Sequence, residues 1–242
     1  MLSLNMLVFG SACAAGPPAG VIHLLMDDWG YGDVESFGSL HPLPGANHPP
    51  AETKTPQLQK MANEGLVLSD FYSAASICSP SRVSWVTGRF PASPSIRFHN
   101  NPGHHKDNIY INNADFLNTS VPTVYKIFND SGWRVGFFGK WALGGGRWQG
   151  GWMPSPSDYG VQIHATYSSN AESGDPRTPP LYPGCPRPQN MDNCTFWASL
   201  SSELIVNKTI ALMQLANAES RRFYVQSSFH AVHATQVEGP KS

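Results

Sequence analysis

The composition describes a chain that can fold but carries no strong overall charge. It has 242 residues, 40% of them hydrophobic, which is enough to bury a core in one large domain or two small ones. Charged residues make up only 14% and the formal net charge is -1, so no global field would attract nucleic acid or an anionic membrane surface. We therefore predict no nucleic-acid partner, and any anion must be bound locally.

Residues 1–15 have the pattern of a signal peptide. A short apolar run ends in small residues, and Ala12-Cys13-Ala14 fits a signal-peptidase site. The alternatives are a buried first strand and a membrane anchor, but the run is too short to span a bilayer. The sequence thus predicts entry into the secretory pathway, with a secreted or lysosomal destination and no membrane span.

Sequons and cysteines agree with this route. Four Asn-x-Ser/Thr sequons predict N-glycosylation, at Asn118, Asn129, Asn193 and Asn207. Once residues 1–15 are removed three cysteines remain, and the closely spaced Cys185 and Cys194 predict a disulfide that closes a small ring. Cys78 then has no predicted disulfide partner, so it is either a buried, inert cysteine or a residue that takes part in the chemistry of the protein.

The first half of the chain reads as a strand, two helices and a further strand. Residues 21–26 are an apolar run that stops at Asp27-Asp28, which predicts a parallel strand with carboxylates at its C-terminal end. Thr55 and Pro56 begin a helix that ends at Gly65. Residues 66–72 are a candidate strand. Ser79-Pro80 opens a second helix, which places Cys78 at that helix's N-terminus.

The second half continues the alternation of helices and strands. Residues 122–130 predict a helix and 134–138 a strand, followed by a loop-rich stretch over 145–200. Residues 201–218 predict the longest helix, and 223–229 a closing strand. Alternation of this kind indicates the α/β class, with a mainly parallel central sheet flanked by helices.

One motif carries a family resemblance. Cys78-Ser79-Pro80-Ser81-Arg82, followed by Thr87-Gly88-Arg89, resembles the Cys-x-Pro-x-Arg sequence of sulfatases with its trailing Thr-Gly-Arg. Four further segments match in the same order, at 26–33, 55–58, 139–144 and 229–233. The resemblance implies an alkaline-phosphatase/sulfatase-like fold, with residues 19–242 forming a truncated N-terminal catalytic domain that lacks the C-terminal part of the fold.

The resemblance implies hydrolysis of an aryl or carbohydrate sulfate ester. In the family the motif cysteine, here Cys78, is oxidised to formylglycine by a formylglycine-generating enzyme. One hydroxyl of the formylglycine hydrate attacks sulfur, and the other then expels sulfate. A helix N-terminus favours such an oxyanion and the anionic sulfate. Arg82 lies one turn later on the same face, where the resemblance implies that it steadies formylglycine and shields charge.

Further site residues also follow from the resemblance. Asp27 and Asp28, with an oxygen of residue 78, would hold Ca²⁺, with Mg²⁺ as the alternative, although an Asp-Asp pair by itself is more often a cap or a turn. Both carboxylates reach one cation only if the backbone is irregular at the strand end. Lys140 would contact the substrate sulfate unless it is simply solvated.

Two positions follow from weaker matches. His233 would bind the sulfate or ester oxygen near the leaving group and could donate a proton to it, whereas His230 is interpreted as a structural residue. Ser168 resembles a serine near the family's substrate site, but its alignment needs a gap.

Two departures from the family predict impaired activity. Ala142 stands where sulfatases usually have a histidine that acts on formylglycine, so we expect slow expulsion of sulfate and a sulfated intermediate that lingers. The sequence also stops nine residues after His233, before the downstream metal ligands, which predicts poor metal affinity. A non-catalytic secreted glycoprotein that binds sulfated glycans through Arg82 and Lys140 is therefore an alternative. A phosphoester or phosphonate hydrolase is a weaker one, because such enzymes usually use Ser or Thr where this chain has Cys78.

Overall fold

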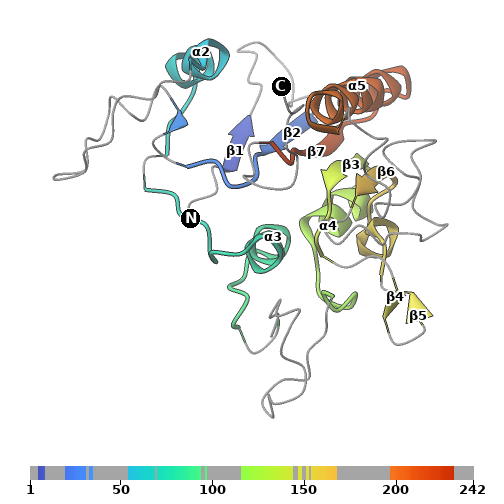
Figure 1. Ribbon diagram of the computed structural model, residues 1–242. Coiled ribbons are helices and arrows are strands. Elements are labelled where there is room, and N and C mark those ends of the chain that lie inside the picture. The colour runs from blue at the N-terminus through green and yellow to red at the C-terminus, as the bar shows by residue number, and fades with distance from the viewer. Residues whose placement is uncertain are drawn as a thin grey trace.

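A computed structural model describes residues 5–8, 20–30, 33–34, 54–68, 70–93, 96, 116–143, 147–148, 151–152, 154–167 and 197–231. Its centre is a five-stranded sheet in the order β1-β2-β7-β3-β6 (Figure 1). The strands are β1 (Asn5–Val8), β2 (Gly20–Leu25), β7 (Phe223–Ser228), β3 (Arg134–Lys140) and β6 (Ile163–Tyr167). Strands β2, β7, β3 and β6 are parallel, and β1 pairs antiparallel with β2 at one edge. This confirms the predicted α/β class and its mainly parallel sheet.

The remaining elements connect these strands. The helices are α2 (Pro56–Glu64), α3 (Cys78–Thr87), α4 (Val124–Asp130) and α5 (Trp197–Ala218), with a 3-10 turn η2 (Pro156–Tyr159). A small two-stranded ribbon pairs β4 (Arg147–Trp148) with β5 (Gly151–Trp152). None of the described helices contains an apolar stretch of the length that a bilayer span requires.

The sheet has a hydrophobic core on each face, because successive side chains of a strand point to opposite sides. On one face Val83 and Val86 of α3 and Tyr125 of α4 pack with aromatic and aliphatic side chains of the strands. On the other face Ile205 and Leu212 of α5 pack against a second set of strand residues. Figure 1 shows α5 alongside β7 and β3, with α2 set apart from the sheet.

The long helix α5 fits closely because one position of β3 has no side chain. A Cβ atom added at Gly136 would lie 2.1 Å from Leu212 Cδ1, well inside any real van der Waals contact. The glycine therefore leaves room for the Leu212 side chain of α5 against β3, and α5 packs on residues of both β3 and β7.

Most predicted elements are confirmed, and the exceptions are local. Residues 66–68 and 70–72 form no strand, so that prediction is wrong, and Gly65 ends α2 with an extended φ of -129° instead of the left-handed cap that glycine favours. Strand β6 lies inside 145–200, which the sequence predicted to be a loop-rich stretch. Residues 5–8 form β1, and the signal peptide stays a prediction.

Candidate active site

The site lies where the parallel strands end. The carboxyl end of β2 leads into Asp27 and Asp28, β3 ends at Lys140, and β7 ends at Ser228 shortly before His230. In open α/β sheets the carboxyl ends of neighbouring strands form the usual crevice for ligands. Asp27 and Lys140 are both buried there, with 4% and 1% of their surface exposed, although charged residues are rarely buried so completely unless they are paired.

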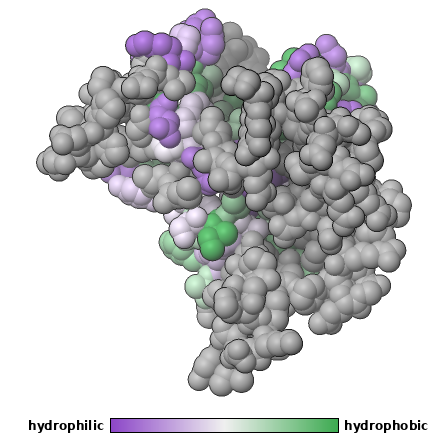
Figure 2. All heavy atoms as spheres, viewed as in Figure 1, coloured by the Kyte–Doolittle hydropathy of each residue, from purple (hydrophilic) through white to green (hydrophobic). Residues whose placement is uncertain are grey.

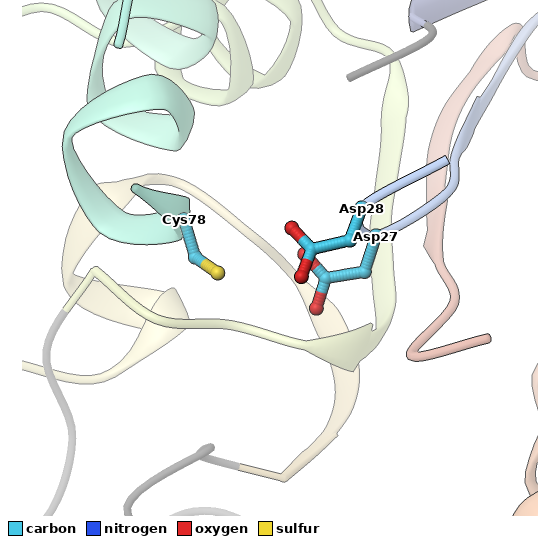
Figure 3. Close-up of side chains that lie close together, drawn as sticks. All are labelled: Asp27, Asp28 and Cys78. Carbon is cyan, nitrogen blue, oxygen red and sulfur yellow. The ribbon is translucent and has the colours of Figure 1, made fainter. Parts of the chain in front are cut away.

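The backbone turns sharply at Asp28. Its φ is 56°, in the left-handed region that few residues other than glycine adopt, although aspartate tolerates it better than most. This is the irregularity that both carboxylates were expected to need. Donor atoms of Asp27, Asp28 and Cys78 all lie within 4.8 Å of one another, and Figure 3 shows the two carboxylates facing Cys78.

Cys78 is the first residue of α3, as predicted. Ile77 precedes the helix with an extended backbone, and Gly88 ends it in the left-handed conformation, with φ 67° and its N–H donating to the carbonyl of Ser84. The thiol is the one free cysteine among the described residues and is half-buried. Helix N-termini carry unpaired N–H groups that favour anions, so the position suits a negatively charged nucleophile or a sulfate group.

Asp27 is the centre of the charged cluster. Lys140 Nζ donates to its Oδ2, Arg82 Nη2 donates to its Oδ1 at 3.3 Å, and His230 Nδ1 lies 3.6 Å from Oδ2. Lys140 Nζ also lies 3.4 Å from Cys78 Sγ. The Asp27 carboxylate therefore contacts the side chains of both Lys140 and Arg82 at this end of the sheet, and the Cys78 thiol lies beside the Lys140 amine.

Arg82 joins the helix to the sheet. Its side chain is buried, and Nη1 donates both to the Lys140 carbonyl at 2.8 Å and to the Ser228 hydroxyl. Ser228 has no predicted role, because a serine at the end of a strand gives no signal by itself. His230, which the sequence indicated as a structural residue, lies beside Asp27, and its role stays a prediction.

A buried polar layer lies between α3 and the sheet. His23 of β2 is fully buried and stacks on Trp85 of α3, with ring centroids 3.9 Å apart. Desolvation by burial lowers the pKa of His23 to about 3, and the positive charge of Arg82 acts in the same direction, whereas a hydrogen bond with Gln226 partly opposes them. Beside it, Tyr125 donates to Gln226 at 2.6 Å.

Ala142 lies close to Lys140 along the chain, in an unusual conformation. It is buried and has a φ of 54°, which is uncommon for alanine and less so for histidine, the residue that the resemblance implies at this position. Its methyl group offers neither a proton nor a lone pair, so this position contributes no acid-base group to the site.

Several predicted positions cannot be placed. His233, Ser168, Cys185, Cys194 and Asn193 lie outside the described residues. Of the other sequons, Asn118 and Asn207 are exposed, and Asn129 is half-buried with its side-chain oxygen accepting a hydrogen bond from Gln162. The structure neither supports nor opposes glycosylation, which stays a prediction.

The side chains at the site match a hard divalent cation in ligand type but are too few to complete its coordination. Carboxylate oxygens are the ligands that Ca²⁺ and Mg²⁺ prefer, and those of Asp27 and Asp28 lie close enough to share one ion after small adjustments. Lys140 Nζ occupies one oxygen of Asp27, so an ion would have to share this carboxylate with the amine. Calcium needs about six to eight ligands, more than these residues offer.

Comparison with solved structures places the fold in the alkaline phosphatase-like class. A Bacteroides thetaiotaomicron structure described as BT33336S-sulf has a TM-score of 0.59 at 18% identity, over 90% of this chain and 52% of that one. A structure described as Ps i-CgsB has a TM-score of 0.58 at 19% identity, over 88% of this chain and 45% of that one. At such low identity these matches establish the fold alone.

Sequence comparison identifies the family. The model of the family Sulfatase matches residues 20–241, so the chain belongs to the sulfatase family. Human arylsulfatase A is 28% identical over 97% of this chain and 45% of its own length, and rat arylsulfatase G is 33% identical over 70% of this chain and 28% of its own. The chain thus spans less than half the length of these relatives.

Proposed function

We propose that this protein hydrolyses a sulfuric ester, with Cys78 as the precursor of the nucleophile. The observation that carries the proposal is the position of Cys78. It begins α3, faces Asp27 and Asp28, and has the amine of Lys140 3.4 Å from its sulfur. Sulfate transfer needs a nucleophile, carboxylates that can hold a cation beside it, and a positive group that offsets the sulfate charge. Here the buried Lys140 supplies that positive group.

The proposed nucleophile is a formylglycine hydrate made from Cys78. One hydroxyl oxygen forms a bond to sulfur as the ester S–O bond breaks, and the alcohol leaves with a proton. The second hydroxyl then loses its proton, the C–O bond to sulfate breaks, and the aldehyde is restored. Lys140 and Arg82 would shield the negative charge of the sulfate, and His233 would supply the proton to the alcohol.

A divalent cation would assist this chemistry. Asp27, Asp28 and an oxygen of residue 78 would hold Ca²⁺, or alternatively Mg²⁺, and the bound ion would polarise the sulfate as a Lewis acid. Family membership supports a metal of this kind, and the two adjacent carboxylates support its position. We further propose that the chain matures in the secretory pathway and reaches a lysosomal or extracellular destination, where it would meet its ester.

The substrate class is proposed from the relatives. Human arylsulfatase A, rat steryl-sulfatase and dog N-acetylgalactosamine-6-sulfatase are among the similar proteins, so an aryl or carbohydrate sulfate is the class to screen. The test is hydrolysis of a chromogenic aryl sulfate by the protein secreted from cells that contain the formylglycine-generating enzyme. We expect sulfate release that Cys78→Ala abolishes, with no comparable cleavage of the matching phosphate ester. Equal release by wild type and Cys78→Ala would contradict the proposal.

Ala142 predicts that turnover is slow after the first attack. Without a base at this position, loss of the second hydroxyl proton limits the release of sulfate, and such a base is commonly worth about 10²- to 10⁴-fold in rate. Intact-protein mass spectrometry should therefore detect a sulfated adduct during reaction, and Ala142→His should shorten its lifetime. Rapid multiple turnover without any adduct would contradict this step.

Ala142 also favours a second candidate, a sulfatase-like glycoprotein that binds sulfated glycans without cleaving them. Arg82 and Lys140 would supply the binding charges, because both cations keep their buried positions beside Asp27. Retention of a sulfated glycan with no release of sulfate, even after Ala142→His, would favour this second function over the first.

A further inference from the structure

Ser228, the last residue of β7, is fully buried between the Arg82 guanidinium and the backbone of Lys140. Its hydroxyl accepts a hydrogen bond from Arg82 Nη1 and donates one to the Lys140 carbonyl at 2.9 Å. The same Nη1 group donates to that carbonyl at 2.8 Å. A closed ring of three hydrogen-bonding groups therefore joins α3, β3 and β7, with the serine hydroxyl contributing both as donor and as acceptor.

This ring fixes the orientation of the guanidinium. Both N–H bonds of Nη1 have an acceptor in the ring, and a guanidinium is planar and rigid. Holding Nη1 therefore fixes the plane in which Nη2 reaches Asp27 Oδ1, at 3.3 Å. Without the Ser228 hydroxyl, Arg82 would keep its bonds to the Lys140 carbonyl and to Asp27 Oδ1 but lose one of the three acceptors that hold the guanidinium plane.

The backbone of β3 is shaped to allow this contact. Gly139 pairs with Ser228 in the parallel ladder and has a φ of 108°. A Cβ atom added at Gly139 would lie 1.9 Å from the Ser228 carbonyl oxygen, so no other residue fits there without moving a strand. Close approach of β7 to the end of β3 thus places the Ser228 hydroxyl within reach of the Lys140 carbonyl, while the Lys140 amine reaches Asp27 and Cys78.

We propose that Ser228 is a positioning residue, which holds Arg82 and Lys140 in the geometry that the site uses to bind an oxyanion such as sulfate. Its effect on sulfate rests on the proposed function. Its hold on the guanidinium does not, because that follows from the hydrogen bonds of the protein alone.

The neighbouring residue Ser227 offers a matched control. Its hydroxyl is also buried in β7, and it pairs with the Thr209 hydroxyl of α5 at 2.6 Å. Ser227→Ala therefore removes a buried hydrogen bond from the same strand, on the face turned away from Arg82. A purely structural role would make Ser227→Ala and Ser228→Ala behave alike, whereas a positioning role separates them.

The experiment uses NMR to compare the rotation of the Arg82 guanidinium in the intact wild-type chain, in Ser228→Ala and in Ser227→Ala. The Arg82 signal is assigned as the one that disappears in Arg82→Lys. We expect Ser228→Ala to speed rotation about the Cζ–Nη bonds and Ser227→Ala to leave it unchanged, although both variants should lower the melting temperature by similar amounts. Unchanged guanidinium signals in Ser228→Ala, or the same change in both variants, would overturn the proposal.

Calorimetric titration with inorganic sulfate tests the consequence for binding. Loss of a hydrogen bond to a charged group predicts about tenfold weaker sulfate affinity in Ser228→Ala, and less than about twofold in Ser227→Ala. Equal weakening in the two variants would overturn the positioning role. If the wild-type chain bound no sulfate while the guanidinium signals changed as expected, the proposed function would fail and the hold on Arg82 would stand.

Discussion

Helices α2 and α3 are similar in length and differ completely in burial. The ten residues of α3 include five buried ones, namely Ser79, Pro80, Arg82, Val83 and Val86, whereas the nine residues of α2 include none. Figure 2 shows hydrophilic side chains gathered over α2. The apolar residues that follow α2 are exposed as well, with Leu66 86% and Tyr72 65% accessible. An amphipathic pattern thus predicts a helix but not whether the described chain supplies a partner for its apolar face.

The largest effect should come from removing the charge that α3 buries. In Arg82→Ala the Asp27 carboxylate loses one of its cations, and Ser228 and the Lys140 carbonyl lose a donor. Breaking a buried ion pair in this way costs about 3–5 kcal/mol of unfolding free energy. Chemical denaturation measures the loss, with Arg89→Ala as the control, because Arg89 is exposed just beyond the same helix. Similar losses in both variants would contradict the buried network.

Apolar packing gives a direct comparison of the two helices. Val83 is fully buried in α3, so Val83→Ala should lower the unfolding free energy by about 2 kcal/mol through lost burial and a small cavity. Met61 is only half-buried in α2, and Met61→Ala should change it by less than about 0.5 kcal/mol. Denaturation midpoints of the two variants measure this difference, and a larger loss in Met61→Ala would reverse the comparison.

The last effect concerns pH. His23, which stacks on Trp85 of α3, has a folded-state pKa of about 3, below its ordinary value of 6.5. As the pH falls below 6.5, His23 takes up a proton in the unfolded chain while it stays neutral in the folded chain. The contribution of neutral His23 to the free energy of unfolding is therefore complete above pH 6.5 and is lost as the pH falls toward 3. The loss is about 1.4 kcal/mol per pH unit. Urea midpoints from pH 7 to 5 should fall less steeply in His23→Phe than in wild type, and parallel curves would contradict a neutral buried imidazole.

Much of the fold could be predicted from local sequence because the signals were strong. The apolar run before Asp27 identified β2, and the Ser79-Pro80 start identified α3 with Cys78 at its first position. The predicted irregularity after β2 is confirmed by the left-handed backbone of Asp28, because two adjacent strand residues could not otherwise face one ion.

Other features depend on partners that sequence does not name. Residues 66–72 have a strand-like composition, yet a strand forms only where a neighbour pairs with it. Strand β6 is short and, within the part of the chain that the structure describes, pairs with β3 alone, so its signal was lost among loops. Ser228 became recognisable only when β7 was aligned with the end of β3, since the acceptor of its proton is a backbone carbonyl 88 residues away.

The central claim is that Cys78 is the precursor of a sulfatase nucleophile, and a mass spectrum of its tryptic peptide tests this most directly. The protein should be isolated from secreting cells that contain the formylglycine-generating enzyme, together with a control sulfatase processed by the same cells. Formylglycine at residue 78 is the predicted result. An unmodified thiol at residue 78, with the control fully converted, would contradict the claim and favour the non-catalytic binding function.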